Sequence, residues 1–458
     1  MSLSHPTEKS KSLLLRWSKY LGNILLTSLI MGTIASIVAA IIFVKWLESP
    51  LKSLTIPVFI TAQDNQGGQF ALGVSRAIDW AQKFKLDEVD GRQVRPFFIN
   101  EDLVGCKPGD SDCSEERNTQ DLVSGIRDLK GDVPIVVGPL TSTHAALLVP
   151  SITKQLGIPM ILGIPTNTEL SAAFNGKVWR LSPTDDLQAE AVAKTLEELV
   201  PHGERSVIVV DSDGQNGGYS KPLAKTVAEK AAGSNHLPTK PVSLEIGSSR
   251  LGEFQQAFLT ANPAVVIYVG MPEQAKRLLS MMADKKMDAK LIFTDGCIDP
   301  EFIQFVVALS KQRPKSQFFM TFQAPPASQS KGIRSYIWFT QSMGGRVTGV
   351  VDQDCGTVSA ATSYEVFGFD AYMMALNLLK DTSRTGKVNR ENVSRTMART
   401  HEPKWPFLLM APYNFDEKGN NKNLRFHLYE IGRDGCVRHS GHEPDSGGAL
   451  CPNDSTGI

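Results

Sequence analysis

Six short segments carry most of the residues in this sequence that could do chemistry. Each follows an apolar run, and each is rich in hydroxyl, amide, glycine or aspartate residues. The segments are DNQGG (64–68), PLTST (139–143), IPTNTE (164–169), DSDGQNGGYS (211–220), GMPE (270–273) and TDGCID (294–299). None of them contains a Lys or an Arg. They are therefore poorly suited to holding a phosphate and better suited to hydrogen bonding with a small polar solute.

Two of these segments favour the binding of a zwitterion. PLTST and IPTNTE offer the hydroxyls of Ser142, Thr143 and Thr166, with backbone N–H groups at the start of a following helix. Helix N-termini attract carboxylates. In TDGCID, Asp295 follows a strand and could accept a hydrogen bond from an ammonium group. The alternative is that Ser142 and Thr166 only cap helices.

Catalytic, metal and nucleotide sites are disfavoured by the same segments. The Ser142–His144 neighbourhood lacks the GxSxG sequence of a nucleophile elbow. Asp211 and Asp213 do not match a calcium-binding loop and are expected in turns or helix caps. The glycine pairs at 67–68 and 217–218 fit neither GxGxxG nor a P-loop. We therefore predict no catalytic residue, no metal and no cofactor, and we do not expect an enzyme.

An alternation of strands and helices must position these segments. Buried strands are predicted at Ile56–Ala62, Val94–Asn100, Val133–Gly138, Ile158–Gly163, Ser206–Asp211, Ala264–Gly270 and Lys290–Gly296. Helices are predicted at Ala71–Phe84, Thr119–Lys130, His144–Gln155, Leu187–Leu199, Tyr219–Ala231, Gly252–Thr260 and Glu273–Asp284. Such alternation indicates an α/β protein with parallel sheets covered on both faces. In these sheets, ligands bind beyond the carboxyl ends of the strands, where the polar segments lie.

The N-terminus predicts a membrane anchor. No charged residue occurs from Leu21 to Val44, and at about 1.5 Å per residue this run could span a hydrocarbon core of roughly 30 Å. The tail before it is basic, because it carries Lys9, Lys11, Arg16 and Lys19 against one acid, Glu8. We therefore predict that residues 1–20 stay in the cytoplasm and that 21–47 form a transmembrane signal anchor. A cleaved signal peptide is the alternative, although its apolar region spans only about 7–15 residues.

Charge and cysteine content agree with an extracytoplasmic protein. The 458 residues have a formal net charge of zero, which argues against a nucleic-acid binder. Six cysteines fit an oxidising compartment. Two local disulfides, Cys106–Cys113 and Cys436–Cys451, are the simplest pairing. Cys297 and Cys355 are then left over, although the sequence alone allows other pairings.

The segment from Val137 to Ser171, VVGPLTSTHAALLVPSITKQLGIPMILGIPTNTELS, resembles a family signature. It is similar to the type I periplasmic solute-binding proteins of the branched-chain amino-acid (Leu/Ile/Val) class. Further similar segments follow in order, so that the resemblance covers nearly all of 54–435. They are VWRLSPTDDLQAEAVA (178–193), VIVVDSDGQNGGYSKPLA (207–224), AVVIYVGMPEQAKRLLSMM (264–282), KLIFTDGCIDPEF (290–302), TSYEVFGFDAYMMALNLL (362–379) and YNFDEKGNNKNLRFHLYEI (413–431).

The resemblance implies a two-lobed type I periplasmic-binding fold. Each lobe is a mainly parallel sheet flanked by helices, and three hinge crossovers join them. Lobe one would comprise 54–182 plus 323–421 and lobe two 183–322 plus 422–440. Residues 441–458, which are rich in Gly, Pro and Ser, would form a flexible tail. Members of the family deliver a solute to an importer of the ATP-binding cassette (ABC) type.

The resemblance also implies roles for individual residues. Ser142 and Thr166 would hold the carboxylate and ammonium groups of an amino acid, with the backbone of Ile164 between them. Asp295 would receive the ammonium group. Tyr219 of lobe two and Tyr364, near the pocket for the ligand's side chain, would complete the site.

Some features depart from the family pattern. Gln66 stands where many members carry an aromatic residue, and no second aromatic residue of the far lobe occurs near Gly270 and Met271. These changes make a polar ligand, such as an amide or a polar amino acid, an alternative to a branched-chain amino acid. We expect a solute-binding protein with ABC permease partners, anchored in the inner membrane with its bulk outside the cytoplasm. A sensor subunit of a membrane receptor and a binder of an amide or urea are the alternatives.

Overall fold

The computed structural model describes residues 53–61, 65–105, 114–129, 132–200, 204–213, 217–233, 241–247, 249–325, 330–342, 364–410, 412–433 and 437–440. The predicted cytoplasmic tail (1–20), anchor (21–47) and C-terminal tail (441–458) lie outside these residues. So do Cys355 and the disulfides predicted for Cys106–Cys113 and Cys436–Cys451. Among the described residues, no helix is long and apolar enough to cross a membrane. The remaining cysteine, Cys297, is buried with a free thiol.

One sheet has six strands in the order β2-β3-β1-β4-β5-β6. The strands are β1 (Leu54–Ile60), β2 (Glu88–Val89), β3 (Arg92–Asn100), β4 (Val136–Val137), β5 (Met160–Leu162) and β6 (Val178–Arg180). All neighbours are parallel except β2, which runs antiparallel to β3. Because side chains alternate along a strand, Ile56 and Val58 of β1 join one apolar cluster and Phe59 joins another on the opposite face. Both faces of this sheet are therefore covered.

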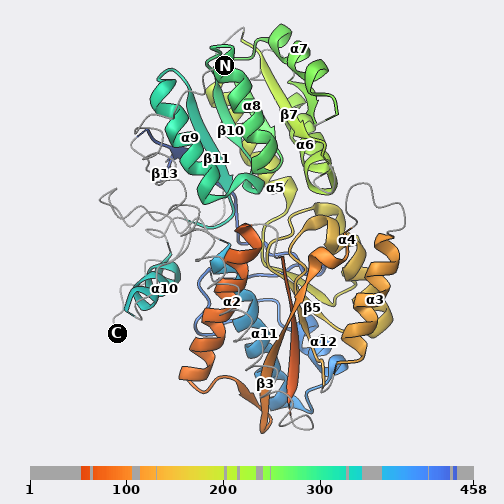
Figure 1. Cartoon of the computed structure of the whole chain (residues 1–458). Coiled ribbons are helices and arrows are strands. Elements are labelled where there is room, and N and C mark those ends of the chain that lie inside the picture. The colour runs from red at the N-terminus through yellow and green to blue at the C-terminus, as the bar shows by residue number, and fades with distance from the viewer. Residues whose placement is uncertain are drawn as a thin grey trace, which may run out of the picture. The chain divides into compact units, whose positions relative to one another are not determined.

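The helices that cover this sheet come from two distant parts of the chain. They are α2 (Asn65–Lys83), α3 (Glu115–Arg127), α4 (Ser142–Pro150), α11 (Glu365–Thr385) and α12 (Arg390–Arg399). Short 3₁₀ helices lie at Glu101–Leu103 and Thr168–Ala173, and a π-helix at Ser151–Leu156 directly follows α4. Figure 1 shows α2 in orange beside α11 in blue, and these two helices pack directly against each other. Arg76 of α2 also forms an ion pair with Glu365 at the start of α11.

The other sheet has seven strands in the order β13-β12-β11-β10-β9-β7-β8. The strands are β7 (Ser206–Asp211), β8 (Val242–Ile246), β9 (Val265–Val269), β10 (Lys290–Phe293), β11 (Gln317–Phe322), β12 (His427–Ile431) and β13 (Val437–His439). The strands β8, β7, β9, β10 and β11 are parallel to one another. β12 runs antiparallel to β11, and β13 runs antiparallel to β12. The two strands from the C-terminal part of the chain, β12 and β13, therefore lie at one edge of this sheet.

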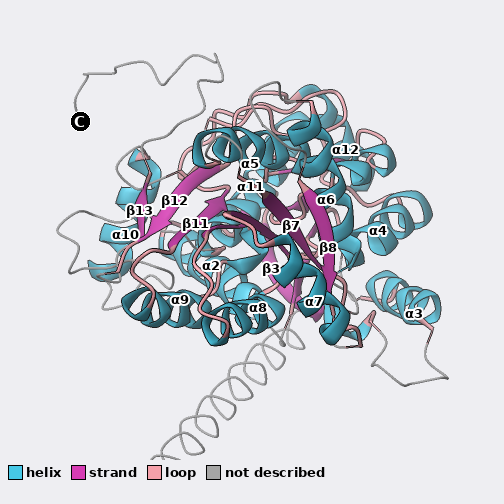
Figure 2. Ribbon diagram, turned by 90° about the horizontal axis from the view of Figure 1, so that it is seen from above, coloured by secondary structure: helices cyan, strands magenta, loops and turns pink. Residues whose placement is uncertain are grey.

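Helices cover both faces of the seven-stranded sheet (Figure 2). They are α5 (Asp185–Leu199), α6 (Gly217–Ala232), α7 (Leu251–Ala261), α8 (Pro272–Asp284) and α9 (Pro300–Gln312); α10 (Lys331–Ser342) follows β11. The alternation of β7 explains the two layers. Val207 and Val209 pack in the same apolar cluster as residues of α7, α8 and α9, whereas Ile208 and Val210 pack with α5 and α6.

The chain passes between the two sheets three times, and the crossing segments lie close together. Residues after β6 lead into α5, and residues after β11 lead towards α11. The third crossing, before β12, is paired with the first. Arg180 N donates to Gly419 O at 2.9 Å, and Asn421 Nδ2 donates to Leu181 O at 2.9 Å. The predicted lobe boundaries at 182/183, 322/323 and 421/422 fall in these crossings and remain predictions.

The predicted strands and helices are confirmed in type, and the differences lie at their ends. The polar segment at 64–68 is helical from Asn65, so α2 begins earlier than the predicted Ala71. The strand predicted over Val133–Gly138 is reduced to Val136–Val137. The helix predicted to begin at His144 begins at Ser142, because the Thr141 side chain accepts a hydrogen bond from His144 N and so caps it.

The contact between α2 and α11 depends on two glycines. A Cβ atom at Gly73 would overlap the backbone of Glu365, and one at Gly368 would overlap the backbone of Phe70. Each glycine thus lets the backbone of the opposite helix approach closely. This reciprocal contact joins the N-terminal and C-terminal parts of the same sheet layer.

We predict that Gly73→Ala lowers the free energy of unfolding by about 1–3 kcal/mol or more, because the helices must separate. Gly125→Ala in α3 is the matched control, because a Cβ there meets nothing within 4 Å. This control should be neutral or stabilising by up to about 1 kcal/mol, as expected for Gly to Ala in an open helix. Chemical denaturation of both variants measures the difference. Equal effects would show that the close approach of α2 and α11 does not matter for stability.

Candidate functional site

A cavity of about 310 Å³ lies where the carboxyl ends of strands from both sheets meet. All of the residues predicted for the site line it: Gln66, Ser142, Thr143, Ile164, Thr166, Tyr219, Asp295 and Tyr364. The cavity is also lined by Thr61, Asp102, Leu140, Thr141, His144, Pro165, Met271, Pro272, Gly296 and Asp299. Its volume is at the lower end of the range for small-molecule sites, roughly 300–1,000 Å³. The structure thus brings the predicted residues together, and their roles remain to be tested.

The hydroxyls of Ser142 and Thr166 do not cap the neighbouring helices. Thr141 caps α4, and Asn167 caps the turn after β5 by accepting from Glu169 N at 2.8 Å. The alternative that Ser142 and Thr166 serve as helix caps is therefore wrong. Ser142 Oγ accepts a hydrogen bond from Asn167 N at 3.3 Å, which joins the two segments. Both hydroxyl side chains are buried at the cavity.

Glu101, which sequence reasoning missed, fixes the segment before α4. Its fully buried carboxylate accepts hydrogen bonds from Leu140 N at 2.7 Å, Thr141 N at 3.0 Å and His144 Nδ1 at 3.1 Å. Burial lowers the pKa of His144, but the hydrogen bond and charge of Glu101 outweigh it, so the pKa of the imidazole is raised. The only sequence signal was an acid directly after a predicted strand.

Asp295 lies at the centre of the hydrogen bonds on the other side of the cavity. Its Oδ1 accepts from Tyr219 OH at 2.6 Å and from Gln188 Nε2 at 2.7 Å, and its Oδ2 accepts from Gln323 Nε2 at 3.3 Å. These donors are all uncharged. Burial raises the pKa of Asp295, and the bonds from Tyr219 and Gln188 oppose that shift. These hydrogen bonds hold the carboxylate of Asp295 in place. None of the three donors is a cation that could balance its negative charge.

Hydrogen bonds cross from the six-stranded to the seven-stranded layer beside the cavity, and one of them runs from Asn167 Nδ2 to Gly218 O of α6 at 3.3 Å. Gln66 Nε2 of α2 donates to Gly296 O at 2.7 Å. Tyr364 OH, just before α11, donates to Asp295 O at 2.9 Å. The acceptors of these last two bonds are backbone carbonyls of the short turn after β10. The predicted polar residue Gln66 and aromatic residue Tyr364 therefore join the two sides of the cavity.

A second buried acid, Asp185, was also missed by sequence reasoning. It is the first residue of α5 and is 2% exposed. Neither carboxylate oxygen has a hydrogen-bond partner within the normal distance among the described residues. Burial raises the pKa of Asp185 to about 7, and the charge of Asp295 adds to the shift. The Thr166 hydroxyl and the Arg180 guanidinium oppose it.

The described residues of the site offer hydroxyls, amides and carboxylates. No group of three His, Cys, Asp or Glu side chains that could hold a metal occurs in the described part of the chain. Asp211, expected in a turn, accepts a hydrogen bond from Asp213 N at 3.0 Å and is confirmed in that role. The cavity is thus lined by the hydroxyl residues around the start of α4 and by the carboxylates of Asp102, Asp295 and Asp299.

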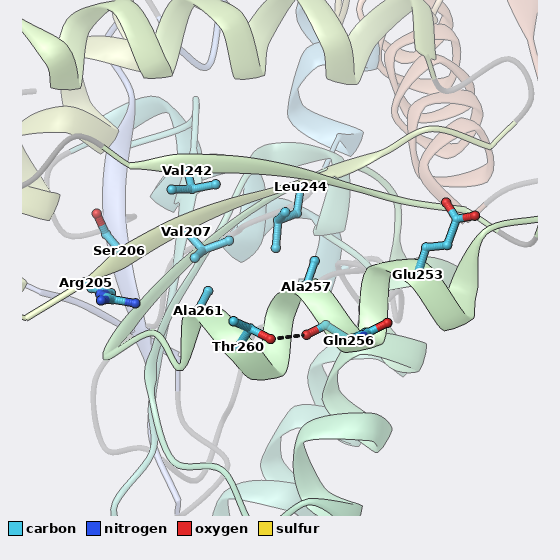
Figure 3. Close-up of a pocket in the computed structure, with 10 residues that line it drawn as sticks. All are labelled: Arg205, Ser206, Val207, Val242, Leu244, Glu253, Gln256, Ala257, Thr260 and Ala261. Carbon is cyan, nitrogen blue, oxygen red and sulfur yellow. Dashed lines mark hydrogen bonds between the residues drawn. The ribbon is translucent and has the colours of Figure 1, made fainter.

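A larger cavity of about 730 Å³ lies elsewhere, between α7 and the first residues of β7 and β8. Figure 3 shows apolar side chains such as Val207, Val242 and Leu244 facing this space. It is at the amino ends of these parallel strands, opposite to the end where ligands bind in such sheets. We therefore take the smaller cavity as the candidate functional site.

Comparison with solved structures identifies the fold. The leucine-binding protein LivK of Thermotoga maritima matches with a TM-score of 0.64 at 18% identity, over 84% of this chain and 97% of that one. The branched-chain amino acid transporter substrate-binding protein LivJ of Streptococcus pneumoniae, in complex with isoleucine, matches with a TM-score of 0.60 at 16% identity, over 84% and 98%. This chain has the type I periplasmic-binding fold.

The type I periplasmic-binding fold also occurs in matches whose ligands are not amino acids. A solute-binding protein of an ABC transporter from Rhodopseudomonas palustris, in complex with 3,4-dihydroxybenzoic acid, matches with a TM-score of 0.60 at 13% identity, over 85% of this chain and 96% of that one. Neither a protein-family model nor a curated protein sequence matches the chain. At such low identity, the structural likeness confirms the predicted fold alone.

We predict that stability falls as pH rises through the interval between the two pKa values of Asp185. The carboxyl ionises near its ordinary value of 3.8 when unfolded but at about 7 in this fold, so the native state binds more protons within that interval. Asp185→Asn removes this titration. It should raise the free energy of unfolding on the order of 3 kcal/mol at about pH 8, with a smaller gain at about pH 5.

Denaturant unfolding at the two pH values tests this expectation. Asp186→Asn is the matched control, because Asp186 is the next residue of α5 and is exposed. The control should change stability by no more than about 0.5 kcal/mol at either pH. A gain in Asp185→Asn that is the same at both pH values would contradict the raised pKa.

Proposed function

We propose that this protein is the extracytoplasmic solute-binding component of an ABC-type importer and that it captures a small amino acid between its two lobes. The observation that carries the proposal is the division of polar groups around the cavity. Ser142 and Thr166 lie on one side, beside the N-terminus of α4, and Asp295 lies on the other. An amino acid has a carboxylate for the first side and an ammonium group for the second. The matched LivJ structure, which contains isoleucine, supports the same class of ligand.

In this mechanism, the amino acid first binds to the six-stranded lobe. Its carboxylate accepts hydrogen bonds from hydroxyls and from backbone N–H groups at the start of α4. Closure then brings Asp295 and Tyr219 over the ammonium group and excludes water. In that drier site the attraction between the ammonium group and Asp295 is stronger than in water. Burial raises the pKa of Asp295 by penalising its charge, and a cationic ligand would stabilise the ionised carboxylate.

The proposal includes the partners and the location of the protein. Permease subunits of the importer would receive the ligand, and the predicted helix over 21–47 would hold the protein at the inner membrane. The bulk of the chain would then lie outside the cytoplasm. No catalytic step is proposed, because binding and release of an unchanged solute need none of the acid–base pairs that an enzyme would require.

We predict that at least one amino acid stabilises the purified full chain in a thermal-shift screen. A ligand that binds only the folded state stabilises it by about 2.7 kcal/mol at a hundredfold excess over Kd. The screen includes urea, short amides, aromatic acids and sugars. A shift with one of these, and none with any amino acid, would keep the fold but contradict the proposed ligand class.

We predict that Asp295→Asn weakens binding of that amino acid by about a hundredfold or more, because the buried ammonium group loses its counter-charge. Asp284→Asn, an exposed acid of α8 in the same lobe, is the control and should leave Kd within about twofold. Isothermal titration calorimetry gives both values. An unchanged Kd in Asp295→Asn would remove Asp295 from the site.

A further inference from the structure

One wall of the larger cavity is formed by β8, which is the edge strand of the seven-stranded sheet. No described strand lies beyond β8 on that side. Val242 of this strand is 55% exposed although it is apolar. The edge of a sheet presents backbone N–H and C=O groups that can pair with a further strand. At β8, such an edge and an apolar groove lie side by side.

The backbone groups that point to the open edge belong to alternate residues of β8. Ile246 O accepts a hydrogen bond from Ser212 N, directly after β7, at 3.0 Å. The backbone groups of Ile246 therefore point towards β7. Because this direction alternates along a strand, the groups of Leu244 point the same way, and those of Ser243 and Glu245 point outwards. These two residues are placed to form hydrogen bonds with another strand.

The side chains of β8 match a second copy of the same strand. Val242, Leu244 and Ile246 alternate with the polar residues Ser243 and Glu245, and Leu244 is the middle residue. If a second β8 runs antiparallel and is centred on Leu244, each Leu244 lies opposite its own counterpart. Val242 then lies opposite Ile246, and Ser243 opposite Glu245. Apolar residues thus meet apolar residues, and the two Glu245 side chains are not directly opposed.

Two exposed charges at opposite ends of the cavity provide an independent match. Arg205 directly precedes β7, and Glu253 lies in the first turn of α7, which follows β8. Figure 3 shows them at the two ends of the groove. Neither forms an ion pair with another residue in the described part of the chain. An antiparallel second copy reverses the two ends, so that Arg205 of each copy lies level with Glu253 of the other.

We propose that the β8 edge and the adjoining groove form the interface of a homodimer. In this dimer, β8 of a second copy pairs antiparallel with β8 about a two-fold axis at Leu244, and the two seven-stranded sheets become one. Ser243 and Glu245 form the hydrogen-bonded pairs. Burial of Val242 and Leu244 stabilises the dimer, and the pairs between Arg205 and Glu253 favour this register.

The proposed interface is separate from the candidate solute site. The two cavities share no lining residue among those described, and they lie at opposite ends of the parallel strands. Dimer formation through β8 therefore leaves the solute site accessible. The inference goes beyond the proposed function and does not depend on it.

A cysteine at the two-fold axis tests the pairing directly. Opposite Cα atoms of a non-hydrogen-bonded antiparallel pair are about 4.5 Å apart, which a disulfide can span. Under mild oxidation, Leu244→Cys should give a disulfide-linked dimer of the full chain on a non-reducing gel. Ser243→Cys is the matched control, because its counterpart lies diagonally, at about 7–8 Å, beyond the reach of a disulfide. It should cross-link no more than the unchanged chain.

Exchange of the two charges tests the interface without cysteines. Sedimentation velocity of the full chain over a concentration series measures the Kd of the dimer. Arg205→Glu should raise this Kd by about tenfold or more, because two like-charge contacts replace two ion pairs. The double variant Arg205→Glu/Glu253→Arg should restore the Kd to within about threefold. Lys404→Glu, an exposed charge reversal in the other lobe, is the control and should change the Kd by no more than about twofold.

Two results would overturn this inference. A full chain that stays monomeric throughout the series, with no cross-link in Leu244→Cys, would leave the groove to a different protein or to a small apolar solute. A dimer that neither cross-links at Leu244 nor responds to Arg205→Glu would have its contact elsewhere. Circular dichroism checks that each variant folds, and if Leu244→Cys does not fold, the charge exchange alone decides.

Discussion

A buried carboxylate must find donors in the protein for the hydrogen bonds that water would otherwise supply, and this requirement organises the site. Glu101 meets it with two backbone N–H groups and an imidazole, and in doing so fixes the segment that leads into α4. Asp295 meets it with a phenol and two amides. Asp185 does not meet it among the described residues. The first acid fixes the segment before α4, whereas burial raises the pKa of the other two.

The same carboxylates explain why the site needs the whole fold. The donors to Asp295 come from α5, α6 and the residue after β11, and the bond to its backbone comes from Tyr364 before α11. These segments are more than a hundred residues apart in places. They meet because parallel strands present their carboxyl ends at one edge, and because the glycine contact between α2 and α11 joins the first and last parts of one layer.

The sequence predicted the fold well, because strands and helices are set by the pattern of apolar and polar residues within each short segment. Alternating apolar runs and amphipathic stretches gave the strands and helices, and the resemblance in Val137–Ser171 gave the family of folds. It also gave the residues that line the cavity. Glu101 and Asp185 could not be predicted in this way, because what sets them apart is burial by distant residues. Leu140, which donates to Glu101, is 39 residues away, and the pKa of Asp185 depends on Asp295. The spacing of residues along the sequence does not predict such contacts between distant residues.

The bonds that cross between the lobes have a consequence for the energetics of opening. Gln66 and Tyr364 both donate to backbone carbonyls, at Gly296 and Asp295, so the acceptors are the same whatever solute occupies the cavity. Under the proposed opening and closing of the lobes, their contribution to the closed state is a fixed offset in the equilibrium between the two forms. The solute adds only its own differential affinity for the closed form. Under the proposed function, changes at lining side chains other than Gln66 and Tyr364 could alter the ligand while the free-energy cost of reopening stays nearly constant.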